Sequence, residues 1–147
     1  MTHEGMVHAL NEIRRVLVRD GISIDLRPLL DHAPLEVVSA SETRIAGTVD
    51  QLPEDRASDE AADRAIAQAE KQNWFIKERE EFFPFNYYWE SPKEAQGYLD
   101  EEWSNSVTVD EEVWRNARSM WAVANADAQV RIQLKMLIAR WKVVKGA

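Results

Sequence analysis

The chain has 147 residues, of which 45% are hydrophobic and 30% are charged, and its formal net charge is −8. These values predict one globular domain, residues 1–147, with a sizeable core. The negative charge argues against nucleic acid or an anionic membrane surface as a partner. The sequence contains no cysteine, no apolar run long enough to span a membrane, and no signal-peptide pattern at its start. We therefore expect a cytoplasmic protein without disulfides or thiolate metal sites.

Residues 8–28 predict a helix, a tight turn and a strand. Gly21 is expected to end the helix in the left-handed conformation. The apolar side chains of the helix recur at helical spacing and share a face that we expect to pack on the sheet; they are Met6, Ala9, Leu10, Ile13, Val16 and Leu17. The strand after Gly21 alternates apolar and polar residues, so it has one apolar face, and Pro28 is expected to close it. The apolar residues of this strand are Ile22, Ile24 and Leu26.

The middle of the chain predicts a hairpin and then a helix. Two short β-rich stretches between Leu35 and Val49 predict the hairpin, and Gly47 indicates a bulge or a close backbone approach. Residues 54–72 predict a helix that ends near Asn73, and its alanine face would let it approach a sheet closely. These alanines recur every four residues: Ala57, Ala61, Ala65 and Ala69.

The second half of the chain predicts strands and helices in alternation. Residues 74–83 are expected to form an edge strand guarded by charges, with a helix as the alternative. The run Ser91-Pro92-Lys93-Glu94 is a capping box, which predicts a helix to about Trp103. Thr108 and Glu111 repeat the capping-box spacing before another helix, and residues 129–143 predict a long strand. The fold class is therefore α/β or α+β, with a mixed, largely antiparallel sheet and three to four helices.

One segment carries a family resemblance. The run ALNEIRRVLVRDGISID resembles the segment that leads into the fifth strand of class I S-adenosylmethionine-dependent methyltransferases, which has the pattern AL-x-E-x-x-RVL-x-PGG. The matching residues are Ala9, Leu10, Glu12, Arg15, Val16, Leu17 and Gly21, whereas Arg19 and Asp20 replace the usual Pro-Gly. The runs EREEFFPFNYYWESPKE and VRIQLKMLIARW are similar to the last third of some of these enzymes. The resemblance therefore implies the C-terminal half of such a domain.

The cofactor half of that family is missing from the sequence. The resemblance implies a Gly-rich turn on the first strands, but no two of the 5 glycines are spaced as G-x-G or G-x-G-x-x-G. We therefore expect no S-adenosylmethionine binding unless a partner chain supplies the missing half. No catalytic residue is assigned, and the three histidines have no metal-ligand spacing, so we expect no metal site.

The best candidate binding residues are at the end of the first strand and in the aromatic run. Ligands of open α/β sheets bind beyond the carboxyl ends of the strands, where Arg27 is suited to bind an anionic group. The candidates are Asp25, Arg27, Asn86, Tyr87, Tyr88 and Trp89. A structural interpretation is favoured over this one: Asp25 pairs with Arg27 or a neighbour, and the aromatic side chains cover the core under the Pro92 helix.

These observations support two main functional hypotheses. The first is a non-enzymatic interaction or small-ligand-binding protein built on a methyltransferase-like half-domain. The alternative is the substrate-side half of a split methyltransferase whose cofactor half is another chain. The strand at Ile22–Leu26 would have an unpaired edge, which the Leu35–Val49 segment, a partner strand or a second copy can cover. We predict a homodimer or a higher closed oligomer that buries the first helix–strand unit or the Leu35–Val49 segment.

Overall fold

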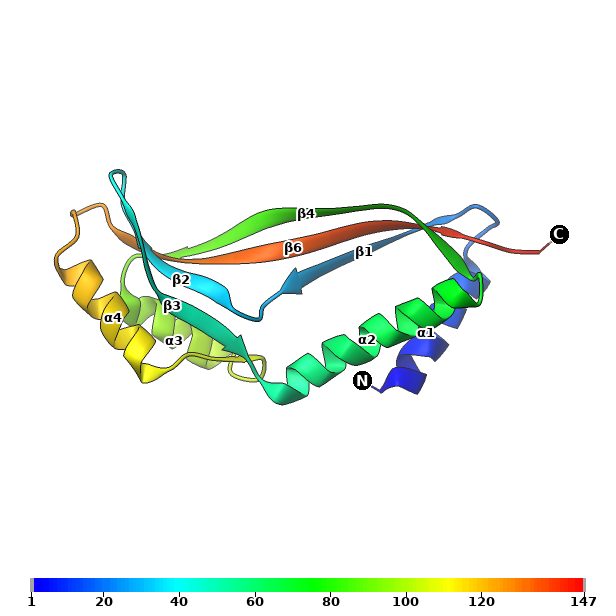
Figure 1. Cartoon of the computed structure of the whole chain (residues 1–147), viewed down its shortest axis with the longest axis horizontal. Helices are drawn as coiled ribbons and strands as arrows, with labels where there is room; N and C mark the ends of the chain where they lie inside the picture. Colours follow the sequence, from blue (N-terminus) through cyan, green and yellow to red (C-terminus); the bar gives the residue numbers. More distant parts are fainter. Residues whose placement is uncertain (1, 147) are drawn as a thin grey trace. The chain divides into compact units, whose positions relative to one another are not determined.

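The computed structural model describes residues 2–146, which form an α+β fold with four helices and a six-stranded, mostly antiparallel sheet (Figure 1). The predicted fold class is thus confirmed. The helices are α1 (His3–Val16), α2 (Pro53–Lys71), α3 (Pro92–Glu102) and α4 (Glu111–Ala122). The strands are β1 (Ile22–Leu29), β2 (Ala33–Val38), β3 (Thr43–Gln51), β4 (Phe75–Trp89), β5 (Val107–Thr108) and β6 (Gln129–Val143). Within the described residues, none of the helices has both the length and the apolar composition that crossing a membrane requires.

The fold divides into two compact units that interleave along the chain. Unit 1 comprises the chain up to Arg27, residues 56–82 and the chain from Leu137, whereas unit 2 comprises residues 28–55 and 83–136. The strand order is β1-β6-β2-β3-β5, and β4 also pairs with β6. Strands β1, β4 and β6 each contribute residues to both units.

Unit 2 is built on the predicted hairpin of β2 and β3. The antiparallel register pairs Leu35 with Gly47 and Glu36 with Ile45, so a bulge lies at this point. A Cβ atom on Gly47 would lie 2.5 Å from Cγ2 of Val113 on α4, which is far inside van der Waals contact. Both alternatives predicted for Gly47, a bulge and a close approach, are therefore confirmed. Strand β2 also pairs antiparallel with the first residues of β6.

Helices α3 and α4 complete unit 2. The predicted capping box is confirmed, because the Ser91 hydroxyl accepts a hydrogen bond from the Glu94 backbone N–H at 3.1 Å. The Glu94 carboxylate in turn accepts a bond from the backbone N–H of Glu90 at 3.1 Å. The core of the unit contains fully buried side chains from the sheet and both helices, among them Leu35, Val49, Ala95, Trp114, Ala117, Val130 and Ile132. Unit 2 thus has an extensively packed apolar core.

Unit 1 has a smaller core beneath α1 and α2, which lie next to one another (Figure 1). The predicted alanine face of α2 is buried at Ala61, Ala65 and Ala69, whereas Ala57 in the first turns of the helix is exposed. Five buried residues form the core, namely Ala69, Phe75, Ala139, Trp141 and Val143. Leu10, Leu17, Ile66 and Trp74 pack against it as partly buried residues. No residue of α1 is buried among those described.

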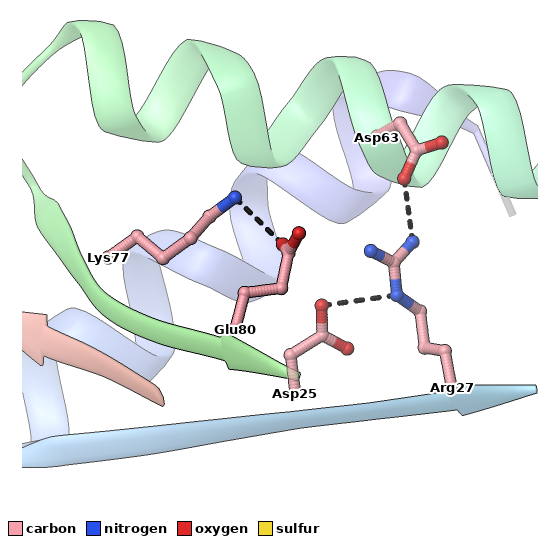
Figure 2. Close-up of polar contacts among 5 residues, drawn as sticks. All are labelled: Asp25, Arg27, Asp63, Lys77 and Glu80. Carbon is pink, nitrogen blue, oxygen red and sulfur yellow. Dashed lines mark hydrogen bonds and ion pairs between the residues drawn. The ribbon is translucent and has the colours of Figure 1, made fainter. Parts of the chain in front are cut away.

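The prediction of which face of the first helix–strand segment is buried is wrong in part. Leu10 and Leu17 are only half-buried, although burial was predicted for them, and Ile13 is 37% exposed. In β1 the apolar residues Ile24 and Leu26 are more than half exposed. Their polar neighbours Asp25 and Arg27 point toward α2 instead (Figure 2). The alternation of polar and apolar side chains along β1 was predicted correctly. It could not specify which face of β1 the helices cover, because ion pairs stabilise the polar face.

The predictions for two residues at helix ends are also wrong. Asp20, not Gly21, has the left-handed conformation, with φ of 64°. Gly21 is needed for space, because a Cβ there would lie 2.8 Å from the Val18 carbonyl oxygen. Helix α4 has Asp110 rather than Thr108 at its N-cap, and Thr108 lies in β5. By contrast, Asn73 ends α2 as expected, with φ of 60°.

Candidate functional site

A cluster of five charged residues lies between β1, β4 and α2 in unit 1 (Figure 2). We call Asp25, Arg27, Asp63, Lys77 and Glu80 the charged cluster. Alternation along β1 directs Asp25 and Arg27 to the same face, and their closest atoms, Oδ2 and Nε, are 3.1 Å apart. Arg27 Nη1 also donates a hydrogen bond of 2.7 Å to Oδ1 of Asp63 on α2. Arg27 therefore links the strand to the helix through two carboxylates.

Strand β4 contributes the other two members of the cluster. Lys77 Nζ donates a hydrogen bond of 2.8 Å to Oε2 of Glu80. The same ammonium group lies 5.3 Å from the centroid of the Trp141 ring, which is a cation–π contact. Glu78 and Glu81, by contrast, pair with Arg140 and Arg79. The three glutamates of β4 are exposed, which fits the edge strand guarded by charges that the sequence predicted.

Burial and like charges shift the pKa of Asp25. Burial is the largest cause and raises the pKa of its carboxyl above the ordinary value, while Arg27 partly offsets this effect. The nearby carboxylates of Asp63 and Glu80 raise it further. Burial lowers the pKa of Arg27, but its bonds to Asp63 and Asp25 raise it more, so this guanidinium stays charged. An additional positive charge or hydrogen-bond donor beside Asp25 would therefore favour the ionised form of its carboxyl.

A cavity of about 170 Å³ adjoins Asp25 in unit 1. Side chains of both helices and of three strands line it: Leu10, Ile13, Ser23, Ile24, Asp25, Ile66, Ala69, Phe75 and Trp141. Ser23 and Asp25 are the polar residues of this wall, and Asp25 is its charged one. The cavity can therefore hold an apolar group while Asp25 contacts a cation or a donor at one side.

The other predicted site residues lie in unit 2. Trp89 is buried, and Tyr87 stacks on it with ring centroids 6.0 Å apart. Tyr87 also contacts Trp103 edge-on, with centroids 5.0 Å apart. These rings thus cover the core beside α3, as the structural interpretation predicted. The structure does not place Asn86–Trp89 in one unit with Asp25 and Arg27.

Two members of that aromatic run, Tyr88 and Asn86, carry polar groups, and their surroundings fit a structural role. Tyr88 forms a hydrogen bond with Arg131, whose Nε donates to Oε1 of buried Glu36 at 2.9 Å. These bonds raise the pKa of Arg131. The Oδ1 atom of Asn86 is buried and, among the described residues, has no hydrogen-bond partner. The cavity of unit 1 combines an apolar wall with Asp25, so we take it and not the aromatic run as the leading binding site.

One group in unit 2 has the composition of a metal site. Donor atoms of Asp31, His32 and Asp50 all lie within 4.8 Å of one another. His32 is 72% exposed at its side chain, and its two ring nitrogens lie 3.4 Å from Asp31 and 3.5 Å from Asp50. A histidine that contacts one carboxylate with each nitrogen fits an ion-paired turn better than a metal ligand, which needs one nitrogen free for the ion.

Sequence reasoning found Asp25 and Arg27 but missed Asp63 and the cavity wall. The signal for Asp63 was weak: Asp59 and Asp63 are four residues apart on α2 and both act on Arg27. The cavity wall combines residues far apart in the chain, and no local pattern brings Ile66 and Trp141 together. Comparisons with protein-family models, curated proteins and solved structures give no match for this chain. The methyltransferase resemblance therefore stays a prediction.

Proposed function

We propose that this chain is a non-enzymatic, cytoplasmic binding protein whose ligand site is the cavity of unit 1. The observation that supports this proposal is the cavity itself, an apolar space with one carboxylate in its wall. Small-molecule sites commonly combine apolar walls with a few placed polar groups. Asp25 is the titratable residue of the described cavity wall, and the neighbouring Asp63 and Glu80 do not line the cavity.

The size of the cavity sets the ligand class. Cavities of about 150 Å³ with walls of Leu, Ile and Phe bind benzene, and this cavity has about 170 Å³. The space therefore suits one ring or a short branched chain. Its charged wall residue is Asp25, so an ammonium or a neutral donor is favoured over an anion. We propose a small amine with a ring-sized apolar body.

Benzylamine is a suitable probe because it joins one aromatic ring to one ammonium group. Calorimetric titration should give a Kd below about 1 mM, which corresponds to about 4.1 kcal/mol. Benzyl alcohol should bind more weakly and benzoate should not bind, since the carboxylate of benzoate would meet Asp25. Equal binding of benzylamine and benzoate would contradict the role of Asp25.

Matched variants separate the cavity from the charged cluster around it. Asp25→Asn keeps the shape and removes the charge, and should weaken benzylamine binding at least about tenfold, because a hydrogen bond to a charged group contributes about 1.5–3 kcal/mol. Asp63→Asn removes a carboxylate of the same cluster that does not line the cavity, and should change the Kd less than about twofold. A larger loss in Asp63→Asn than in Asp25→Asn would place the ligand elsewhere.

S-adenosylmethionine tests the non-enzymatic part of the proposal. The cavity is far too small for this cofactor, whose nucleoside and amino acid together exceed one ring. The same titration should therefore show no binding to the isolated chain. Binding at micromolar affinity would overturn the proposal and favour the methyltransferase alternative.

A further inference from the structure

The two outer strands of unit 1 protect their edges differently. Both β1 and β4 are hydrogen-bonded to β6, and each has no other strand neighbour within the described chain. Strand β4 carries five consecutive charged residues, 77–81, and a proline at position 84. Charges and proline are the usual means of preventing an edge strand from pairing with another chain. Strand β1 lacks such a run: Ile24 and Leu26 are 56% and 54% exposed.

The free edge of β1 can be assigned to particular residues. The Val143 backbone N–H of β6 donates a 2.8 Å hydrogen bond to the Gly21 carbonyl, so this carbonyl points at β6, whereas the Gly21 N–H donates to the Val18 carbonyl. Backbone groups alternate sides along a strand. Those of Ile22, Ile24 and Leu26 therefore point to the free edge. Pro28 belongs to the same outward set, so it removes one N–H donor near the end of this edge and leaves those of Ile22, Ile24 and Leu26.

We propose that β1 pairs antiparallel with β1 of a second copy of this chain, with the two Leu26 residues opposite each other on the two-fold axis. Charge complementarity selects this register. It places Asp25 of each copy opposite Arg27 of the other, on the same face of the joined sheet. Shifting the centre to position 25 would oppose two aspartates, and shifting it to position 27 would oppose two arginines.

The hydrogen-bond pattern agrees with this register. Because Leu26 points its backbone groups outward, the two Leu26 residues form a hydrogen-bonded pair. Positions 25 and 27 then form the closer, non-hydrogen-bonded type of pair, which brings their charged side chains together. The exposed Leu26 side chains of the two copies also cover each other on the opposite face. The inference does not depend on the ligand of the cavity.

Single cysteines test the register directly, because the chain has no cysteine of its own. In the proposed pair the Cα atoms at position 26 are about 5.5 Å apart, within the range of a disulfide. Leu26→Cys should therefore form at least about tenfold more disulfide dimer under mild oxidation than Ile24→Cys, whose two copies lie about 13 Å apart. Equal cross-linking of the two variants would overturn the register.

The mass in solution tests the pairing itself. Light scattering after gel filtration at micromolar concentration should give twice the chain mass of 16.9 kDa. Leu26→Lys places two like charges at the axis and should give the monomer mass. Ile76→Lys makes a similar change at a 49% exposed residue of β4, and should leave the dimer intact. A monomeric native chain, or loss of the dimer in Ile76→Lys alone, would overturn the proposal.

Discussion

The two units of this protein differ in the size of their buried apolar cores. Among the described residues, the apolar core of unit 2 has 15 buried residues and that of unit 1 has five, while the buried charge of Glu36 pairs with Arg131 in unit 2. Unit 1 also contains an ion-paired strand–helix contact and a cavity beside Asp25. A larger buried apolar core contributes more stability than a smaller one that adjoins a cavity. We infer that unit 2 contributes most of the stability of the fold, whereas the proposed ligand site lies in unit 1.

The largest expected effect is in the core of unit 2. Ile132 of β6 is 0% exposed. Ile132→Ala should lower the free energy of unfolding by about 2–5 kcal/mol, because it removes buried methyl groups and leaves a cavity. Urea denaturation followed by circular dichroism measures this loss at a fixed protein concentration. A loss below about 1 kcal/mol would show that unit 2 can relax around the void and is not tightly packed.

Overpacking gives the second test of unit 2. Gly47→Ala puts a methyl group 2.5 Å from Val113 Cγ2, so β3 or α4 must move. We expect a loss of about 1–3 kcal/mol in the same denaturation experiment. Gly97→Ala is the control, because a Cβ there meets nothing within 4 Å. The exposed helical position should gain up to about 1 kcal/mol. Equal effects of the two variants would contradict the close packing at Gly47.

A smaller effect is expected for the corresponding change in unit 1. Leu17 at the end of α1 is half-buried, not fully buried as the sequence predicted. Leu17→Ala should cost about 1–2 kcal/mol, roughly half of the value of full leucine burial. Glu12→Ala, which breaks an exposed pair with Arg15, should cost less than about 0.5 kcal/mol. A loss in Leu17→Ala as large as in Ile132→Ala would remove the difference between the units.

The pH dependence of stability tests the charged interior of unit 1. The pKa of Asp25 is raised in the folded chain, so the native carboxyl binds its proton more tightly than the unfolded one. The contribution of the Asp25 carboxyl to the free energy of unfolding is therefore greatest at low pH. It decreases as the pH rises from 3.8 through the raised native pKa. Asp25→Asn should remove this decrease. Urea denaturation of both proteins across this range measures the difference, and parallel profiles would contradict the burial of Asp25.

Local sequence patterns predicted the helices and strands better than they predicted which surroundings these elements have in the fold. The limits of β6, the alanine face of α2 and the capping box at Ser91 were all predicted from short-range spacing, since each depends on neighbours in the sequence. The buried face of β1 was not, because Asp25 and Arg27 become the inner face only through Asp63, which lies 36 residues from Arg27. The cavity was missed for the same reason. Contacts between residues far apart in the sequence thus determined the buried face of β1 and the cavity, which local periodicity could not predict.

Native-state amide hydrogen exchange, with and without benzylamine, tests the division of roles most directly. Exchange reports the free energy of local opening for each segment. We predict that amides of α1 and α2 open at lower free energy than those of β2 and β3, and that benzylamine slows exchange in the segments of α1, α2, β1, β4 and β6 that line the cavity. Equal protection in both units, or slowing that is confined to unit 2, would contradict the account.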